Sequence, residues 1–363
     1  MAKWVCYTLT ARSPFHFGER GVGMEEASVT LHSDTLFSAL CLALLELGED
    51  LEGFLSAFPR MLFEAEKPPQ ILPGAPPFRI SSAFPFWAKE KETQSAGRVF
   101  FFPKPFMRVN IQIQEGDPKQ AKTLKKIQFI SQQVLESWLA GAQLDFSYEN
   151  LVQGRKIWLT PAEKKAITAD RIWVEDTQPH VTVDRLSSAS QPYSVGQVRF
   201  VDQAGLFFLV DYNDLKWQPV VEKALRLLGD SGIGGERSSG KGQFELGLLE
   251  DFSLATPPNA NGFTTLSLYW PPRSETENGI LNEASYGLIQ RRGWIGAPGS
   301  MNLRRRGVRM VTEGSVFAQK PEGALADVKP LDPEEVPNVT HAVWRYGLAF
   351  TLPCQRAQED NDA

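Results

Sequence analysis

A glycine-rich segment, Gly232–Gly242, restricts the possible folds more than any other part of the sequence. Its eleven positions hold five glycines, two serines, one arginine and one lysine. Glycine adopts positive φ angles readily and lets a backbone approach a ligand closely, because it has no Cβ. Consecutive N–H groups in such a turn can form a concave anion site, and Arg237 and Lys241 add positive charge beside it. The segment therefore predicts a phosphate-binding loop, for a nucleotide or for a nucleic-acid backbone.

The flanking segments favour a nucleic acid over a nucleotide. Gln218–Leu228 has helical apolar spacing and Gln243–Leu249 has the pattern of a strand, whereas a P-loop joins a strand to a following helix. Gly242 also occupies the position where a P-loop needs Ser or Thr to bind Mg²⁺. A dinucleotide-binding fingerprint would need glycine where Arg237 stands. A P-loop-like nucleotide-binding protein and a plain surface turn are the alternatives.

An arginine cluster provides a second basic feature. Between Leu288 and Val311 there are six arginines and no acidic residue. They are Arg291, Arg292, Arg304, Arg305, Arg306 and Arg309. The net charge of the whole chain is −5, but an acidic protein can still present one strongly positive groove. Arginines bind phosphates, and Trp294 offers a face on which a base can stack. The cluster predicts contact with RNA or DNA, with a solvated charged face as the alternative.

Length and composition indicate an ordinary globular protein. A chain of 363 residues, 42% hydrophobic and 22% charged, is long enough for two domains. Its three cysteines are scattered and form no CxxC pair, so neither a disulfide framework nor a zinc site is expected. No apolar run approaches the roughly 20 residues that a membrane-spanning helix needs, and the N-terminus lacks a secretory signal. We expect a cytoplasmic protein with no membrane association, no metal and no cofactor.

The apolar periodicity predicts an α+β architecture in each half of the chain. The first predicted helix should have Ser33 or Asp34 as its N-cap, and Thr256–Gly262 should be a linker. A long exposed hairpin should include Val181–Arg185 and Gln197–Phe200. The other expected strands are Trp4–Thr10, Arg98–Phe102, Leu206–Tyr212, Gln243–Leu249, Thr264–Trp270, Gly287–Gln290, Arg309–Val311, Ser315–Ala318 and Val343–Leu352, and the expected helices are Leu36–Leu47, Lys119–Gly141 and Gln218–Leu228.

The sequence contains no convincing catalytic set. The four histidines, His16, His32, His180 and His341, lack the spacing of metal ligands, and no GxSxG nucleophile motif occurs. Asp34 is explained as a helix cap, and Asp184 is explained as a partner of Arg185. We therefore expect no enzymatic activity.

Several segments together resemble the RAMP superfamily of CRISPR RNA-binding proteins. The glycine segment Ile233–Phe244 matches the GxGGxxSxGxGxF loop that follows the second helix of a ferredoxin-like (RRM-like) domain in that superfamily. More narrowly, the chain looks like the Cas5-like fourth subunit of the type III-A Csm effector complex. The supporting segments are Leu31–Leu40, His180–Arg185, Arg291–Trp294, Glu313–Phe317 and His341–Gly347. The resemblance covers nearly the whole chain, although Glu64–Leu159 matches nothing specific.

The resemblance implies two ferredoxin-like domains. The N-terminal one would cover residues 1–255, with insertions and a β-hairpin thumb at about Pro179–Phe200. The C-terminal one would cover residues 262–353, and residues 354–363 would form an acidic flexible tail.

It also implies a non-catalytic subunit in antiviral defence that binds and caps the 5′ handle of crRNA. Its protein partners would be the large Cas10-type subunit and the backbone subunit 3 of the Csm complex. The thumb would intercalate at the guide–target duplex, so target RNA near the first guide segment is a further partner. The alternative within the superfamily is an endoribonuclease that processes precursor crRNA, with His16 or His32 as the general acid–base.

The expected RNA-binding residues combine the two basic features with a few neighbours. They are His32, Ser33, Arg185, Gly232, Gly234, Gly235, Arg237, Ser238, Ser239, Gly240, Lys241, Gly242, Arg291, Arg292, Trp294, Arg304, Arg305 and Arg306.

Overall fold

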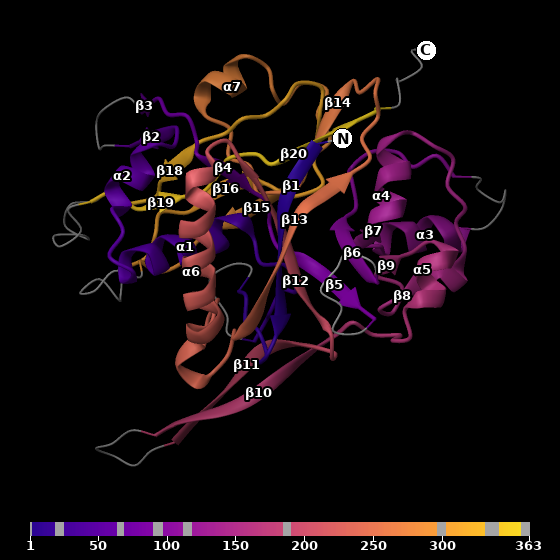
Figure 1. The fold of residues 1–363 in the computed structure, drawn as a ribbon, viewed down its shortest axis with the longest axis horizontal. Helices are drawn as coiled ribbons and strands as arrows, with labels where there is room; N and C mark the ends of the chain where they lie inside the picture. The colour runs from indigo at the N-terminus through magenta and orange to yellow at the C-terminus, as the bar shows by residue number, and fades with distance from the viewer. Residues whose placement is uncertain are drawn as a thin grey trace.

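A computed structural model shows an α+β protein with several sheets, in which strands form most of the regular elements (Figure 1). It describes residues 2–18, 25–63, 69–89, 97–111, 118–183, 190–295, 303–330 and 341–356. The α+β prediction is confirmed. No helix in these ranges is long and apolar enough to cross a membrane.

The main sheet begins with four antiparallel neighbours in the order β13-β1-β12-β5. These strands are β13 (Phe244–Leu254), β1 (Ala2–Ala11), β12 (Ala204–Tyr212) and β5 (Phe84–Ala88), and β4 (Phe78–Ile80) also pairs with β12. Strand side chains alternate between the two faces, and both faces of the centre are apolar. Tyr7 lies opposite Phe208 and belongs to one core, whereas Cys6 lies opposite Leu209 and belongs to the other.

Two long helices, α1 (Ser33–Glu46) and α6 (Gln218–Ser231), pack against each other on the Tyr7 face (Figure 1). Leu40 of α1 and Leu225 of α6 belong to the same buried core as Tyr7. The helix α2 (Leu51–Ser56) follows α1, and the single turn η2 (Leu215–Trp217) precedes α6. The opposite face packs against the C-terminal part of the chain through Phe350 and Leu352. The sheet is therefore covered on both sides.

Residues 98–167 extend the main sheet on the side of β5, in the order β6-β7-β9-β8. The elements are β6 (Arg98–Pro103), α3 (Pro118–Lys126), β7 (Phe129–Ser131), α4 (Gln132–Leu139), η1 (Tyr148–Asn150), β8 (Leu151–Val152), β9 (Ile157–Trp158) and α5 (Pro161–Ala166). The prediction of one helix over Lys119–Gly141 is wrong. A strand interrupts it, because Ile130 pairs with both β6 and β9 and Ser131 then caps a new helix by accepting a hydrogen bond from the Val134 N–H.

The C-terminal part consists of short strands that also pair with the N-terminal part. Its elements are β14 (Gly262–Thr265), α7 (Arg273–Glu277), β15 (Leu288–Arg291), β16 (Val308–Val311), β17 (Val316–Phe317), β18 (Leu325–Asp327), β19 (Trp344–Arg345) and β20 (Thr351–Cys354). β14 lies between β17 and β20, and β15 pairs with β16. β18 pairs with β2 (Arg60–Leu62), which in turn pairs with β3 (Gln70–Leu72). The expected strand Thr264–Trp270 is observed as Gly262–Thr265, and two short strands, β19 and β20, replace the single expected strand Val343–Leu352. The domain boundaries stay a prediction.

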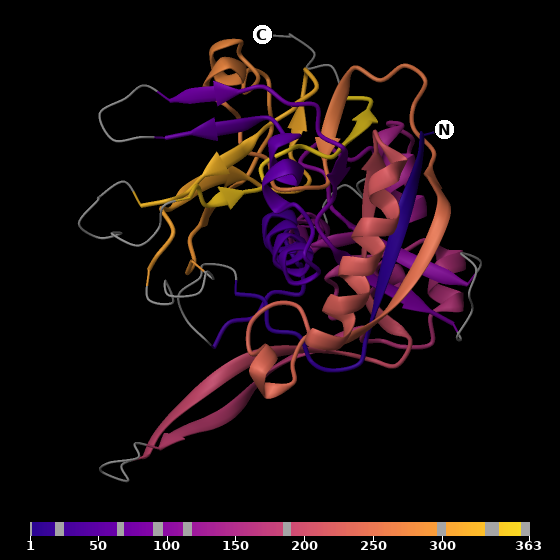
Figure 2. The same ribbon diagram turned by 60° about the vertical axis from the view of Figure 1, so that its left-hand side comes forward.

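A long antiparallel hairpin projects from the body of the protein (Figures 1 and 2). Its strands are β10 (Trp173–Val183) and β11 (Ser190–Phe200), which pair along their full length. The base is buried around Trp173 and Val198, whereas Val181 near the far end is 59% exposed. The hairpin prediction is confirmed, and both strands are longer than expected. Asp184 and Arg185 lie outside the described residues.

A buried ion cluster joins the first turn of α1 to the C-terminal part. The Asp34 carboxylate accepts two hydrogen bonds of 3.0 Å from Arg291, through Nε and Nη2, and a further one from Arg345. All three side chains are buried. The prediction of Ser33 or Asp34 as N-cap is wrong. His32 is the N-cap residue, and the Ser33 hydroxyl instead accepts a hydrogen bond from the Leu268 N–H.

A second buried pair supports the same junction. The His32 Nδ1 lies 2.8 Å from the Glu313 carboxylate, to which the Ser82 hydroxyl also donates. Breaking a buried ion pair costs far more than breaking an exposed one, because the remaining partner is left charged and desolvated. The Asp34 contacts therefore hold α1 against β15 and β19, and the His32 contact joins the start of α1 to the segment between β16 and β17.

We predict that Asp34→Asn lowers the free energy of unfolding by about 3–5 kcal/mol, because it leaves Arg291 and Arg345 buried without a counter-charge. Urea unfolding measures the change. The matched control is Asp251→Asn, which removes an exposed pair with Lys3 and should cost less than about 1 kcal/mol. Equal, small losses in both variants would contradict the structural role of Asp34.

The same comparison should depend on pH. Burial alone would raise the pKa of Asp34, but the guanidinium groups of Arg291 and Arg345 outweigh it and hold the pKa below its ordinary value. Such a carboxylate contributes stability that is fully present above its unfolded pKa, about 3.9, and is lost as pH falls through its folded pKa. The difference in unfolding free energy between the wild type and Asp34→Asn should therefore shrink below about pH 4. A difference that stays constant from pH 7 to pH 3 would refute this.

Candidate nucleic-acid interface

The glycine loop connects the end of α6 to the start of β13, as the sequence predicts. Gly232 ends the helix with φ 84°, and its N–H donates to the Leu228 carbonyl at 2.8 Å. The Ile233 N–H then donates to the Gly242 carbonyl at 3.0 Å, so the two ends of the loop meet. Between them lies the short helical turn η3 (Arg237–Ser239). The observed order, helix then loop then strand, is the reverse of a P-loop.

Most of the loop glycines are required by contacts within the protein. A Cβ at Gly232 would lie 2.5 Å from the Lys241 carbonyl oxygen, and one at Gly242 would clash with the Ile233 carbonyl. A Cβ at Gly234 or Gly235 would lie 2.7 Å from the His16 backbone or ring. Gly240, with φ 83°, faces open space. Contacts within the protein therefore explain the glycine at each of these four crowded positions, and no close approach of a ligand is needed to explain it.

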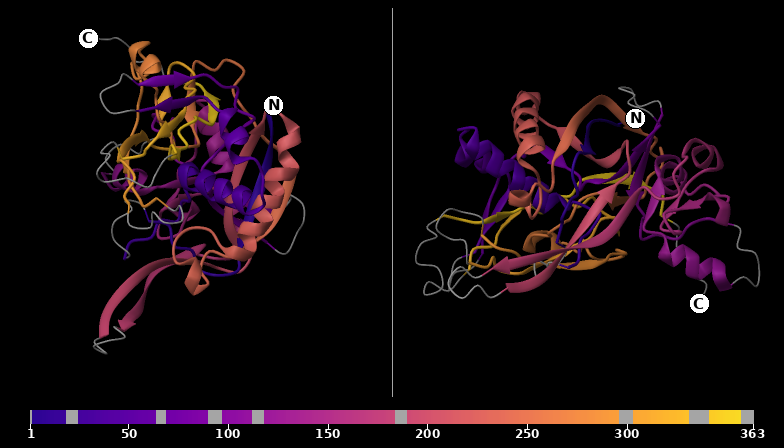
Figure 3. Two further views of the ribbon diagram at one scale, coloured as in Figure 1. Left: turned by 90° about the vertical axis from the view of Figure 1, so that its left-hand side faces the viewer. Right: turned by 90° about the horizontal axis from the view of Figure 1, so that it is seen from below.

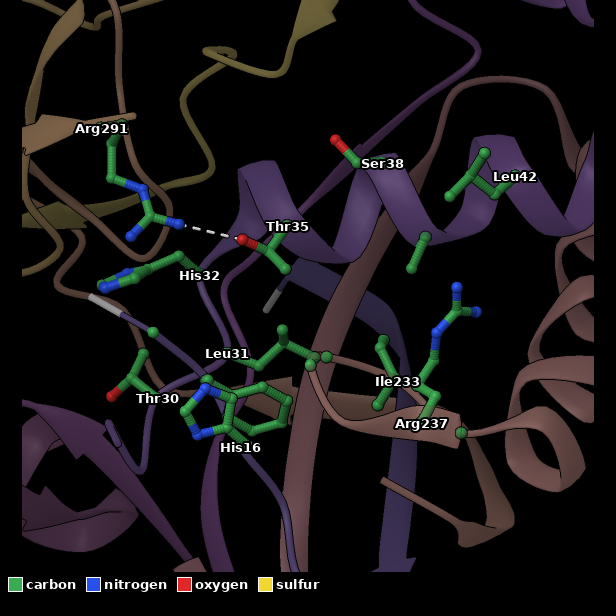
Figure 4. A pocket seen from close by; sticks show the side chains of 16 residues that line it. His16, Thr30, Leu31, His32, Thr35, Ser38, Leu42, Ile233, Arg237 and Arg291 are labelled. Atoms are coloured by element: carbon green, nitrogen blue, oxygen red, sulfur yellow. Dashed lines mark hydrogen bonds between the residues drawn. The ribbon is translucent and has the colours of Figure 1, made fainter. Parts of the chain in front are cut away.

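A cavity of about 180 Å³ lies between this loop and the first turns of α1 (Figure 4). Its walls are formed by the segments that precede α1, by α1 itself and by the glycine loop, and one residue of the C-terminal part, Arg291, completes them. The lining residues are His16, Phe17, Gly18, Thr30, Leu31, His32, Thr35, Ser38, Ala39, Leu42, Gly232, Ile233, Gly234, Gly235, Arg237 and Arg291. The Arg291 Nη2 donates to the Thr35 hydroxyl at 2.9 Å on the cavity wall, and the same guanidinium also donates to Asp34.

Two histidines on the cavity wall have their Nδ1 atoms fixed by acceptors. The His16 Nδ1 lies 2.7 Å from the Gly196 carbonyl oxygen, and the His32 Nδ1 lies 2.8 Å from a Glu313 carboxylate oxygen. Since a carbonyl can only accept, we infer that the His16 Nδ1 carries the proton. Burial would raise the pKa of Glu313, but His32 and Ser82 outweigh it and lower that pKa. The Nε2 atom of each ring is the one left for a ligand.

The Lys241 side chain lies elsewhere than the sequence predicts, since we expected it to face a bound phosphate. It is only 4% exposed, and its ammonium group donates to the side-chain oxygens of Gln178, at 2.8 Å, and Gln197. Burial lowers its pKa, and the nearby carboxylates Glu236 and Asp176 oppose the shift. Its described contacts are therefore to the base of the hairpin, and direct RNA binding by Lys241 stays a prediction.

The remaining loop positions are more accessible. Arg237, Ser238, Ser239 and Gly240 are exposed on η3 and just after it. The Ser239 hydroxyl donates to the Glu236 carbonyl at 2.8 Å, which stabilises the turn. Arg237 is thus the basic side chain that the loop itself presents at the cavity.

The arginine cluster divides into structural and exposed members. Arg291 is buried against Asp34, so the assumption that the cluster lacks acidic compensation is wrong for this residue. Arg306 donates to the Asp327 carbonyl and lies 4.2 Å over the Phe63 ring. These two arginines are engaged in holding the fold.

A second hollow of about 320 Å³ lies beside the exposed members of the cluster. Arg304 lies 5.0 Å over the ring of Trp294, which is 50% exposed. Arg292 is exposed, and Arg305 is half-buried, with burial and the neighbouring Arg345 lowering its pKa to about 10. The other lining residues are Gln290, Gly293 and Gly307. This surface presents cations and one aromatic face, the two groups that single-stranded nucleic acids bind.

The structure brings the predicted residues into two places. His32, Arg237, Arg291 and the glycines 232, 234 and 235 line the first cavity, whereas Arg292, Trp294, Arg304 and Arg305 line the second hollow. Ser33 is buried at the start of α1 and lines neither cavity.

The sequence reasoning missed Thr35 and Ser38 on the cavity wall, and Glu313 behind His32. Helical spacing from His32 could have indicated the first two. Glu313 is 281 residues away, so no local pattern signals it. Within the described residues, no group of three or more His, Cys, Asp or Glu side chains could hold a metal ion.

A family model, curated relatives and solved structures all relate this chain to Csm4. A family model described as the CRISPR Csm4 C-terminal domain matches residues 258–354. The CRISPR system Cms protein Csm4 of Mycobacterium tuberculosis (strain ATCC 25618 / H37Rv) is 28% identical over 320 residues, covering 86% of this chain and 88% of that protein. Csm4 of Streptococcus thermophilus is 26% identical over 351 residues, covering 93% and 95% respectively.

Solved structures show the same fold. The chain is similar to one in the Csm3-Csm4 subcomplex of the type III-A CRISPR-Cas interference complex, with a TM-score of 0.61 and 20% identity, covering 97% of this chain and 99% of that one. It is also similar to a chain in the Csm1-Csm4 cassette in complex with cA4, with a TM-score of 0.57 and 19% identity, covering 98% and 100%. The domain match and the similarity along nearly the whole length identify Csm4 proteins of type III CRISPR complexes as the relatives of this chain.

Proposed function

We propose that this chain is the Csm4-type subunit of such a complex, that it binds and caps the 5′ handle of crRNA and anchors the large Cas10-type subunit, and that it catalyses no reaction itself. The observation that carries the proposal is the cavity between the glycine loop and α1, where Arg237 and main-chain groups meet. Its walls mix apolar side chains with polar groups, and Arg237 adds the positive charge that suits a bent phosphate backbone. RNA binding and antiviral defence follow from the family.

The arrangement of the first half supports the proposed ferredoxin-like domain. The elements β1, α1, β5, β12, α6 and β13 follow one another in the order βαββαβ, and the sheet order is β13-β1-β12-β5. We propose residues 1–255 as this domain and residues 262–353 as a second one. The β10–β11 hairpin would be the thumb that inserts at the guide–target duplex, because it extends beyond the body of the protein (Figure 2).

The proposed RNA path includes the second hollow. Arg292 and Arg304 would neutralise phosphates, and the exposed face of Trp294 would stack on an unpaired base. A constant handle can be recognised by its shape and a few bases, while base pairing by the guide selects the target.

The protein partners are proposed from the relatives. The solved structures similar to this chain pair Csm4 with Csm3 in one case and with Csm1 in another. We propose that this chain contacts the corresponding backbone and large subunits, and that the complex acts in the cytoplasm.

We predict that the double variant Arg237→Ala/Arg304→Ala weakens binding of handle-bearing crRNA and flattens its salt dependence. Each lost phosphate contact should reduce the slope of log K against log salt by about 0.7, so by roughly 1.4 for two. Fluorescence anisotropy at several salt concentrations measures it. The matched control, Arg226→Ala/Arg273→Ala, removes the same charge from exposed positions on α6 and α7 and should leave the slope unchanged. An unchanged slope in the first variant would remove these arginines from the RNA path.

One observation favours the endoribonuclease as a second candidate function. His16 and His32 line the same cavity, with Nδ1 fixed on each ring, and two such imidazoles are suited to general acid–base cleavage of RNA.

We predict that purified protein leaves repeat-containing RNA intact in the presence of EDTA, because each histidine is bonded within the fold, His16 to the Gly196 carbonyl and His32 to Glu313, which favours a structural role. Denaturing gel electrophoresis is the measurement. Site-specific cleavage that disappears in His32→Ala would overturn the non-catalytic proposal and establish the nuclease.

A further inference from the structure

We propose that Lys241 and His16 fix the direction of the β10–β11 hairpin relative to the glycine loop, so that the loop and the hairpin behave as one rigid unit. Lys241 is then a positioning residue that acts through the hairpin. The proposal rests on the described contacts and stands whether or not the loop binds RNA. If the proposed function holds, the loop that binds RNA also determines the direction in which the hairpin points.

The first contact is made by the Lys241 ammonium group. Its two acceptors, the side-chain oxygens of Gln178 and Gln197, lie on opposite strands of the hairpin. Gln197 is paired in register with Asp176, two residues before Gln178, so the two glutamines lie on one face of the ribbon. One buried cation thus holds both strands to the loop.

Asp176 belongs to the same face. It forms an ion pair with Arg199, and its Oδ1 atom is buried without a hydrogen-bond partner among the described residues. The Asp176 carboxylate is paired in register with Gln197, which accepts from Lys241, and its negative charge opposes the lowering of the Lys241 pKa by burial. The region around Lys241 is therefore complementary to a cation.

His16 makes the second contact, from the other side. Its Nδ1 donates to the Gly196 carbonyl on β11 at 2.7 Å, while its own carbonyl accepts the Gly235 N–H at 2.9 Å. A Cβ at Gly196 would clash with the Glu25 carbonyl, and a Cβ at Gly235 would lie 2.7 Å from the His16 ring. The chain is thus closely packed from the loop through His16 to the hairpin.

Backbone hydrogen bonds of the neighbouring residues complete the connection. The Pro14 carbonyl accepts the Gly242 N–H at 2.9 Å. The Phe15 N–H and carbonyl both pair with Val198, at 2.9 and 2.8 Å. The segment from Pro14 to His16 is therefore bonded to the loop on one side and to β11 on the other.

These contacts hold the half of the hairpin that is nearer the body of the protein, and they reach as far as Gln178, the sixth of the eleven residues of β10. At about 3.3 Å per residue, the five residues from Gln178 to Val183 extend roughly 17 Å, so a rotation of about 10° at Gln178 would move Val183 by roughly 3 Å. Figure 3 shows that the far part of the hairpin leaves the body of the protein. The direction of the hairpin is consequently determined at the base, where Lys241 and His16 lie.

The experiment measures distances between spin labels on the full-length protein without RNA, by double electron–electron resonance. Labels are placed at Thr182→Cys on β10 and Arg226→Cys on α6, both exposed, in a Cys41→Ser background; Cys6 and Cys354 are buried. Lys241→Met removes the cation, and Gln178→Ala removes one acceptor from an exposed side chain without altering the loop. The matched control is Thr177→Ala, on the opposite face of the same strand.

We expect the distance distribution to broaden at least about twofold in both Lys241→Met and Gln178→Ala, and to keep its wild-type width in Thr177→Ala. Gln178→Ala decides the result if Lys241→Met does not fold. A wild-type width in Gln178→Ala or in folded Lys241→Met overturns the proposal. Because no RNA is present, failure of the proposed RNA function would leave this result unchanged, and the RNA titration of the Arg237→Ala/Arg304→Ala variant tests that function separately.

Discussion

The Asp34 carboxylate is the interaction on which the candidate site depends. It holds Arg291 and Arg345, from strands of the C-terminal part, against the first turn of α1. With its Nε and Nη2 bonded to Asp34, Arg291 also reaches Thr35 on the wall of the cavity. Three charged groups buried together are stable only because each is paired, and removing one leaves the others desolvated. The shape of the cavity is thus tied to the packing of two parts of the chain that are distant in sequence.

The basic residues of this protein perform two distinct tasks. Arg291, Arg345 and Lys241 are buried and bonded to other parts of the chain, so their charge serves assembly of the fold. Arg237 and Arg304 are exposed at the two hollows, and their charge is accessible to a polyanion. A count of basic residues in the sequence does not separate these groups, although they respond differently to salt: buried pairs are screened far less than exposed charges.

The parts of the fold set by local patterns could be predicted from the sequence. The order of α6, glycine loop and β13 follows from apolar spacing and from glycines, and the hairpin follows from strand alternation. The partners of Asp34 are 257 and 311 residues away, so its ion pairs have no local signal and a cap was the natural interpretation. The apolar spacing around Ile130 fits a helix, but pairing with β6 and β9 outweighs that preference. Lys241 looked like a phosphate ligand because its glutamine acceptors lie on a hairpin distant in sequence.

The glycine loop has a consequence for how recognition can vary. Gly232, Gly234, Gly235 and Gly242 are fixed by their own neighbours, so the course of the backbone is determined without reference to any bound molecule. Ser238 lies between them on the exposed turn and carries no such constraint. A change of side chain there would alter which groups a ligand meets while leaving the frame in place. The loop therefore separates the residues that maintain its shape from those that can set its selectivity, and a new preference can arise by single substitutions.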